Sequence, residues 1–322
     1  MTETIIISLL GTATSIAVAI YSAMVSNRNS KKLELLKNNL EQEKADKNAK
    51  RDYEYEAKKR LYQAYEPLFF QLSELSEIAL SRLEGMAKNY KEGLFKSEWE
   101  GFNSYYFKET VYKLFAPLAI IKLINDKLTT IDLSIDENLS CQYGLLKTLY
   151  FSLQEDGKLA SIIGDLDYLN KWKENYRTDL AEVDRQAINL SELDKITKLF
   201  VSEKNGNHSL LEIGDFEDLL IEKSNPKIQR SVNVIEKLFK NFSPEKKRVL
   251  WTLLLSHACI YKILIDARFD KNLNKEKVIN LATQFYAEMG NDFSTSENAD
   301  VNSKFLEGSK KYIIRQINKR IR

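Results

Sequence analysis

An uncharged run near the N-terminus constrains this chain more than any other feature. No charged residue occurs between Glu3 and Arg28, and residues 5–25 read IIISLLGTATSIAVAIYSAMV. The 24 residues between the two charges would span roughly 36 Å as an α-helix, at about 1.5 Å per residue. A bilayer has a hydrocarbon core about 30 Å thick. The run therefore predicts a transmembrane anchor over residues 1–27.

Two alternatives for this run are weaker. A signal peptide would carry positive charge before its apolar run, followed by a small-residue cleavage site, whereas here Glu3 leads. A buried helix of a soluble protein would usually show a polar face. The basic residues that follow the run should stay in the cytoplasm: Arg28, Lys31 and Lys32. We therefore expect a single-pass protein of the cell inner membrane, with its N-terminus outside and its C-terminal domain in the cytoplasm.

Small residues recur at every fourth position of the run, at Gly11, Ser15, Ala19 and Ala23. On a helix they form one stripe, which lets two helix backbones approach closely in lipid. The stripe predicts a homo-oligomer packed through the membrane helix. The alternative is that small residues are simply common in membrane helices.

Residues 28–65 contain neither proline nor glycine and predict a long helical stalk. The spacing typical of a coiled-coil seam occurs at its start, at Leu33, Leu36 and Leu40. The seam then fades, because Glu43 and Lys47 occupy the next core positions. We expect a stalk with short coiled-coil character and weak dimerisation.

The rest of the chain indicates an all-α fold. The 322 residues include only 11 glycines and 4 prolines, fewer turn residues than strand-rich folds need. The polar segment SEKNGNHS, residues 202–209, is the clearest loop and divides a multi-helix cytoplasmic part into subdomains 66–201 and 210–322. Pro67 lies inside an amphipathic pattern, where we expect a kink or the start of a new helix.

A second apolar stretch, VLWTLLLSHACIYKILI, covers residues 249–265. His257 and Lys262 within it argue for a central core helix, although a second membrane segment stays open. His257 and Cys259 are two positions apart, so on a helix they point in different directions and cannot bind one metal ion together. Both are interpreted as core residues.

Sequence motifs for catalysis are missing. No Gly-rich phosphate loop and no H-E-x-x-H pattern occurs, and two cysteines make no disulfide framework. Two carboxylate clusters could serve a hydrolase: Asp132, Asp136 and Glu137 form one, and Asp165 and Asp167 form the other. The segment TTIDLSIDEN, which contains the first cluster, is however typical of an ordinary helix cap and turn. We predict no catalytic residue, no metal ligand and no cofactor, and the sequence favours a protein that is not an enzyme.

The C-terminal segment KKYIIRQINKRIR carries six basic residues, Lys310, Lys311, Arg315, Lys319, Arg320 and Arg322. Such a basic amphipathic helix can contact an anionic membrane surface or a polyanion. The favoured alternative is a closing helix whose isoleucines cover the core and whose charges face water.

The block RDYEYEAKKRLYQAYEPLFFQLSELSEIAL, which begins at Arg51, resembles a family of bacterial proteins with no established reaction. In that family a membrane segment precedes a YEYEA-x-x-RLY…EPL-x-FQL block. The resemblance covers about residues 50–200. It implies a bacterial source and an anchor followed by a helical domain, and it implies no functional residue.

Three hypotheses for function follow. The favoured one is a non-enzymatic, membrane-anchored interaction or sensor protein, such as a self-associating defence or stress effector with an unidentified protein partner. The second is a membrane-anchored hydrolase, a nuclease or phosphodiesterase, with an unrecognised carboxylate site. The third is a membrane tether for nucleic acid through the basic tail; nucleic acid is the less favoured partner because the net charge is only +2.

Overall fold

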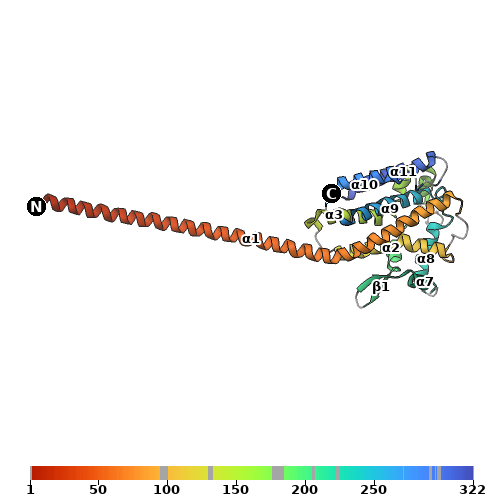
Figure 1. The fold of residues 1–322 in the computed structure, drawn as a ribbon, viewed down its shortest axis with the longest axis horizontal. Helices are drawn as coiled ribbons and strands as arrows, with labels where there is room; N and C mark the ends of the chain where they lie inside the picture. Colours follow the sequence, from red (N-terminus) through yellow and green to blue (C-terminus); the bar gives the residue numbers. More distant parts are fainter. Residues whose placement is uncertain are drawn as a thin grey trace. The chain divides into compact units, whose positions relative to one another are not determined.

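Helices dominate the computed structural model, as the sequence predicts (Figure 1). It describes residues 2–94, 101–129, 133–175, 185–204, 207–221, 225–270, 272–289, 292–293, 295 and 299–321. The all-α class is confirmed. The membrane anchor, the coiled coil and the cytoplasmic location stay predictions.

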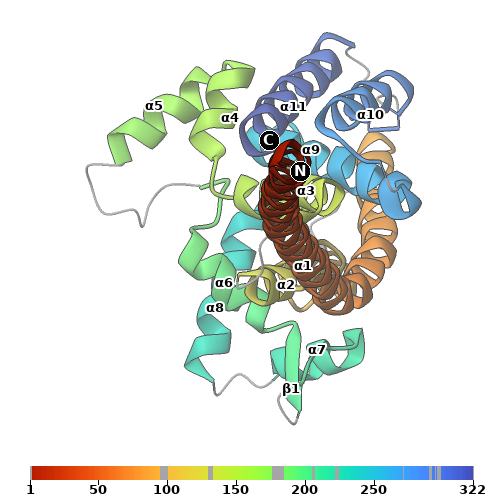
Figure 2. The ribbon, with the colours of Figure 1, turned by 90° about the vertical axis from the view of Figure 1, so that its left-hand side faces the viewer.

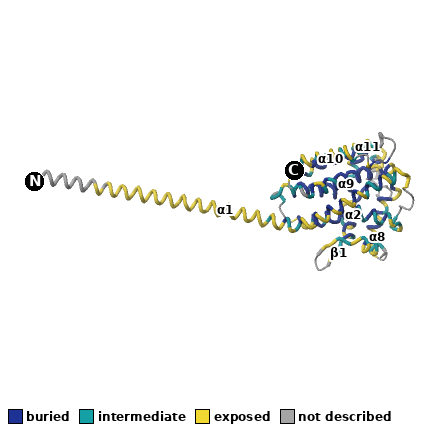
Figure 3. Tube along the Cα trace, viewed as in Figure 1, coloured by how far each residue is buried: buried dark blue, intermediate teal, exposed yellow. Residues whose placement is uncertain are grey.

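The first helix, α1, runs from Thr2 to Lys91. The chain divides into two compact units, Met1–Lys59 and Arg60–Arg322. Apart from the half-buried Ala57, the described side chains of the first unit are exposed, as Figure 3 shows for the helix as a whole. The new helix expected at Pro67 does not form, because α1 continues through it. Pro67 and Gln63 are both exposed, so water can bind the Gln63 carbonyl that lacks its helical N–H donor.

The second unit is a helical assembly around a buried core. Its elements are α2 (Tyr105–Leu128), η2 (Leu133–Ile135), α3 (Glu137–Ser152), α4 (Asp156–Ile163), α5 (Leu166–Asn175), α6 (Leu190–Lys198), α7 (Ile213–Ile221), α8 (Pro226–Phe239), α9 (Arg248–Asp266), η3 (Ala267–Phe269), α10 (Lys275–Glu288) and α11 (Ala299–Arg320). Figure 2 shows α10 and α11 beside α9, with α3 next to them.

The central helix is α9. It packs against α3, α4, α10 and α11, and most of its residues are buried. Among the described residues it is the one helix long and apolar enough to cross a membrane. A helix covered by protein on several sides has little surface for lipid, so the structure favours the core helix predicted for residues 249–265.

The predicted loop at residues 202–209 is largely a β-hairpin. Strands β1 (Val201–Lys204) and β2 (Asn207–Leu210) pair antiparallel, with Val201 opposite Leu210. Val201 and Leu210, at the two ends of the hairpin, pack against the core. The residues between them are polar, and for this reason their composition indicated a loop. Asn205–Gly206 was the missed signal, because this pair is typical of two-residue hairpin turns. The subdomain boundary placed here stays a prediction.

Candidate functional site

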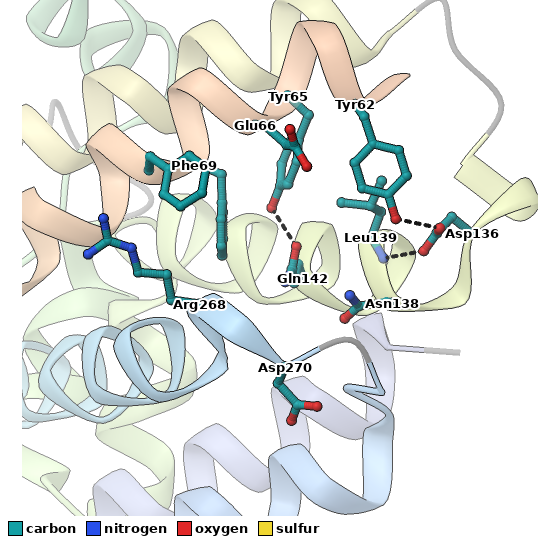
Figure 4. Close-up of a pocket in the computed structure, with 11 residues that line it drawn as sticks. Tyr62, Tyr65, Glu66, Phe69, Asp136, Asn138, Leu139, Gln142, Arg268 and Asp270 are labelled. Atoms are coloured by element: carbon teal, nitrogen blue, oxygen red, sulfur yellow. Dashed lines mark hydrogen bonds between the residues drawn. The ribbon is translucent and has the colours of Figure 1, made fainter. Parts of the chain in front are cut away.

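The second unit contains a cavity of about 500 Å³ among its described residues (Figure 4). Three segments far apart in the sequence line it: one face of α1, the first turns of α3, and the residues that follow α9. The volume lies within the range of about 300–1,000 Å³ that small-molecule sites occupy.

Aromatic side chains of α1 form the first wall. The helical spacing of i, i+3 and i+4 places side chains on one face, and the members of this face are Tyr62, Tyr65, Glu66, Phe69 and Phe70. The rings of Tyr65 and Phe69 stack with centroids 5.1 Å apart. The Tyr65 hydroxyl donates to Gln142 Oε1 of α3 at 3.0 Å, which joins the two walls.

Asp136 begins the second wall and starts α3. Its backbone is extended, and its carboxylate accepts from the backbone N–H of Leu139 at 3.0 Å. The cap-and-turn interpretation of this segment is therefore confirmed for Asp136. Its second oxygen accepts from the Tyr62 hydroxyl at 2.8 Å. Burial, with a contribution from this bond to Asp136, raises the pKa of Tyr62 to about 12, so Tyr62 stays a neutral donor at physiological pH.

The third wall contains Arg268 and Asp270, and each of them has a partner of opposite charge. Arg268 Nη1 donates to Glu74 Oε1 at 2.6 Å, and its guanidinium lies 5.2 Å from the centre of the Phe70 ring. Asp270 Oδ2 is 2.5 Å from Lys277 Nζ, and this bond keeps the pKa of Asp270 below its usual value. The wall is thus electrically balanced.

Unbalanced negative charge remains on the other two walls. Among the described residues, Glu66 and Asp136 have no ion-pair partner. Asn138, also in the lining, has a buried Oδ1 atom with no hydrogen-bond partner among them. The cavity therefore presents aromatic faces, hydrogen-bond acceptors and the ion-paired Arg268 guanidinium to whatever enters it.

Histidine and cysteine take no part in this cavity. His257 is buried in α9, with Nε2 2.7 Å from Ser152 Oγ, and burial lowers its pKa to about 3. Burial also raises the pKa of the Cys259 thiol. Both are core residues, as the sequence predicts. No group of three or more His, Cys, Asp or Glu side chains suited to a metal ion occurs in the part of the chain that the structure describes.

The remaining sequence-predicted carboxylates do not gather into one site. Asp165 accepts from the backbone N–H of Tyr168 at 3.1 Å, near the start of α5. Asp167 and Glu137 are exposed, and Asp132 lies outside the described residues.

The small-residue stripe is on α1, where Ser15, Ala19 and Ala23 are exposed. The surroundings of Gly11 lie outside the described side chains. No residue of the stripe lines the cavity.

The basic tail forms α11 and packs by its apolar face. Ile313, Ile317 and Ile321 are buried, as the closing-helix alternative predicts. Arg320 donates to Glu155 at 3.3 Å and to the Lys147 carbonyl at 3.2 Å.

The other basic residues of the tail differ in their surroundings. Lys311 pairs with Glu307 at 3.4 Å. Lys310 is half-buried, whereas Arg315 and Lys319 are exposed. Arg322 lies outside the described residues.

Sequence reasoning missed the cavity because its walls come from α1, α3 and the end of α9. The available signal was local: the aromatic and acidic residues of YQAYEPLFF share one helical face. Comparison with known protein families, curated proteins and solved structures finds no match for this chain.

Proposed function

We propose that this chain is a non-enzymatic, membrane-anchored interaction or sensor protein that self-associates through α1. The observation that carries the proposal is the exposed apolar surface of the first unit. Five large apolar side chains of one short segment are each more than half exposed: Ile16 (61%), Val18 (67%), Ile20 (58%), Tyr21 (72%) and Met24 (59%).

These side chains surround much of the helix. At about 100° per residue they spread over more than half of its circumference, and small residues such as Ser15, Ala19 and Ala23 occupy much of the rest. Burying a large apolar side chain contributes about 2 kcal/mol, so this segment favours an apolar medium. Lipid satisfies the bulky face, and a second copy of the helix fits the small-residue face.

Contacts elsewhere favour an interaction protein over the other two hypotheses. Asp136 and Asp165 accept backbone N–H groups at helix starts, which is a structural use of the carboxylates a hydrolase would need. The isoleucines of α11 cover the core and Arg320 is bound to Glu155, which leaves less of the tail for nucleic acid.

A membrane extraction experiment tests the anchor. The full chain is expressed in a bacterial host, and membranes are washed with alkaline carbonate. We expect the wild-type chain to stay in the pellet and the Ile16→Arg/Ile20→Arg variant to be released, because each arginine near the centre of a membrane helix costs about 3 kcal/mol.

The matched control places two arginines at the same spacing in the stalk, as Glu34→Arg/Asn38→Arg. Both positions are exposed on the same helix, and this variant should stay in the pellet. Release of the wild-type chain by carbonate would contradict the proposed anchor.

A further inference from the structure

We propose that the cavity between α1, α3 and the end of α9 binds a small organic ammonium ion. The site goes beyond the membrane role and does not depend on it, because every residue in its lining belongs to the second unit.

Charge balance gives the sign of the ligand. Of the charged groups in the lining, Arg268 is neutralised by Glu74 and Asp270 by Lys277. Glu66 and Asp136 are left without a cationic partner among the described residues, so the lining of the cavity has about two unbalanced negative charges. A cation gains from this field and an anion loses.

Aromatic faces give the chemical class. Tyr62, Tyr65 and Phe69 follow one another along the α1 wall, as Figure 4 shows. The face of an aromatic ring attracts ammonium groups, and the attraction grows when water is excluded. Tyr65 and Phe69 are buried, and the bond from Tyr62 to Asp136 holds the Tyr62 ring in place. Rings of this kind suit an alkylammonium group better than a hydrated metal ion.

Free acceptors suit the ligand's N–H groups. Asn138 Oδ1 is buried without a hydrogen-bond partner among the described residues, and an unsatisfied buried polar atom costs about 1–3 kcal/mol. A primary ammonium group brings three donors and no acceptor. Glu66 is exposed, so it stands where a cation would enter from water, and Asp136 lies further inside.

Binding is tested on the full chain in a mild non-ionic detergent by isothermal titration calorimetry. The probes are choline and putrescine, with 3,3-dimethyl-1-butanol as the uncharged carbon analogue of choline. We expect at least one of the two cations to bind, and the uncharged analogue to bind at least tenfold more weakly. The proposal would be overturned if choline bound and its uncharged analogue bound equally well, or if neither cation gave heat at millimolar concentration.

Two variants place the ligand in this cavity. Glu66→Gln and Asp136→Asn each remove one charge, and asparagine is also a good helix cap, so α3 should keep its start. Each should weaken binding about tenfold. Glu77→Gln is the matched control, because Glu77 is exposed on the same helix and does not line the cavity; its affinity should equal that of the wild type.

Ring replacement tests the aromatic wall separately. Tyr62→Phe keeps the ring face but loses the bond to Asp136, so it should lose less affinity than Tyr62→Leu, which should lose about tenfold. Thermal unfolding of each variant shows whether it is folded. If a variant with a change in the interior does not fold, the location of the cation is tested with Glu66→Gln, because Glu66 is exposed. Unchanged affinity in Glu66→Gln would place the cation elsewhere and contradict the proposed site.

Discussion

Gly144 shows how one residue can decide how closely two helices approach. It lies in the middle of α3, where the end of α11 crosses it. A Cβ atom at this position would lie 2.8 Å from Ile321 Cγ1 and 3.1 Å from the backbone oxygen of Arg320. The second of these atoms belongs to the main chain and cannot turn away, so a side chain at this position would push the two segments apart.

We expect Gly144→Ala to lower the free energy of unfolding by about 1–3 kcal/mol, the usual cost of overpacking a core. Gly85→Ala is the control within a helix. No atom lies within 4 Å of a Cβ atom built at Gly85, so the helix preference of alanine should stabilise it by up to about 1 kcal/mol. Denaturant unfolding of both variants measures whether each substitution raises or lowers the free energy of unfolding. A stabilising Gly144→Ala would contradict the crowded contact.

At the scale of the element, α1 combines three compositions in one helix. Its first part is uncharged, its middle part is polar and exposed, and its last part is amphipathic and enters the core at Leu61. A helix of this length is not held together by propensity alone, since most helical stability comes from packing an apolar face. The first part therefore needs an apolar partner, which the proposed bilayer and second copy supply.

The small-residue stripe yields a test of self-association. We expect Gly11→Leu/Ser15→Leu to reduce the crosslinked oligomers of the full chain in membranes, because large side chains separate the two helix backbones. Ala13→Leu/Ala17→Leu adds leucines two residues further on, about 200° around the helix, and should crosslink like the wild type. An unchanged oligomer pattern in the first variant would remove the stripe as the contact.

At the scale of the whole molecule, the core of the second unit contains a buried histidine, His257, which is neutral in the folded chain. Ser152 Oγ donates its one hydrogen to the Leu149 carbonyl at 2.7 Å. The Ser152 oxygen therefore accepts from His257, and the proton lies on His257 Nε2. Burial lowers the pKa of His257 from 6.5 to about 3, so the unfolded chain binds this proton at a higher pH than the folded chain.

This difference predicts sensitivity to acid. Above pH 6.5 the imidazole of His257 is neutral in both the folded and the unfolded chain, so its protonation changes the free energy of unfolding little. As the pH falls from about 6.5 towards 3, only the unfolded state takes up the proton, and stability falls by up to about 1.4 kcal/mol per pH unit. Urea unfolding of the wild type and of His257→Gln at pH 7 and pH 5 checks this. The variant should lose less stability between the two; parallel losses would rule out His257 as the cause.

How much could be predicted depended on whether the signal was local. The all-α class, the helix over residues 249–265, the cap at Asp136 and the core positions of His257 and Cys259 all followed from patterns of residues close together in the sequence. The hairpin at residues 201–210 was missed because composition outweighed the Asn-Gly signal. Of the two alternatives at Pro67, the start of a new helix is excluded, because α1 continues through this exposed proline.

The helical class and the uncharged N-terminal run can be read from the amino-acid sequence, since both depend on residues close together along the chain. Where charge and aromatic surface come together depends instead on how distant segments pack. Glu66, Asp136 and Arg268 are separated by 70 and 132 positions, and no periodicity links them. Packing of α1, α3 and α9 brings these side chains to one cavity, and the ion pairs formed there decide which carboxylates keep a cation and which do not.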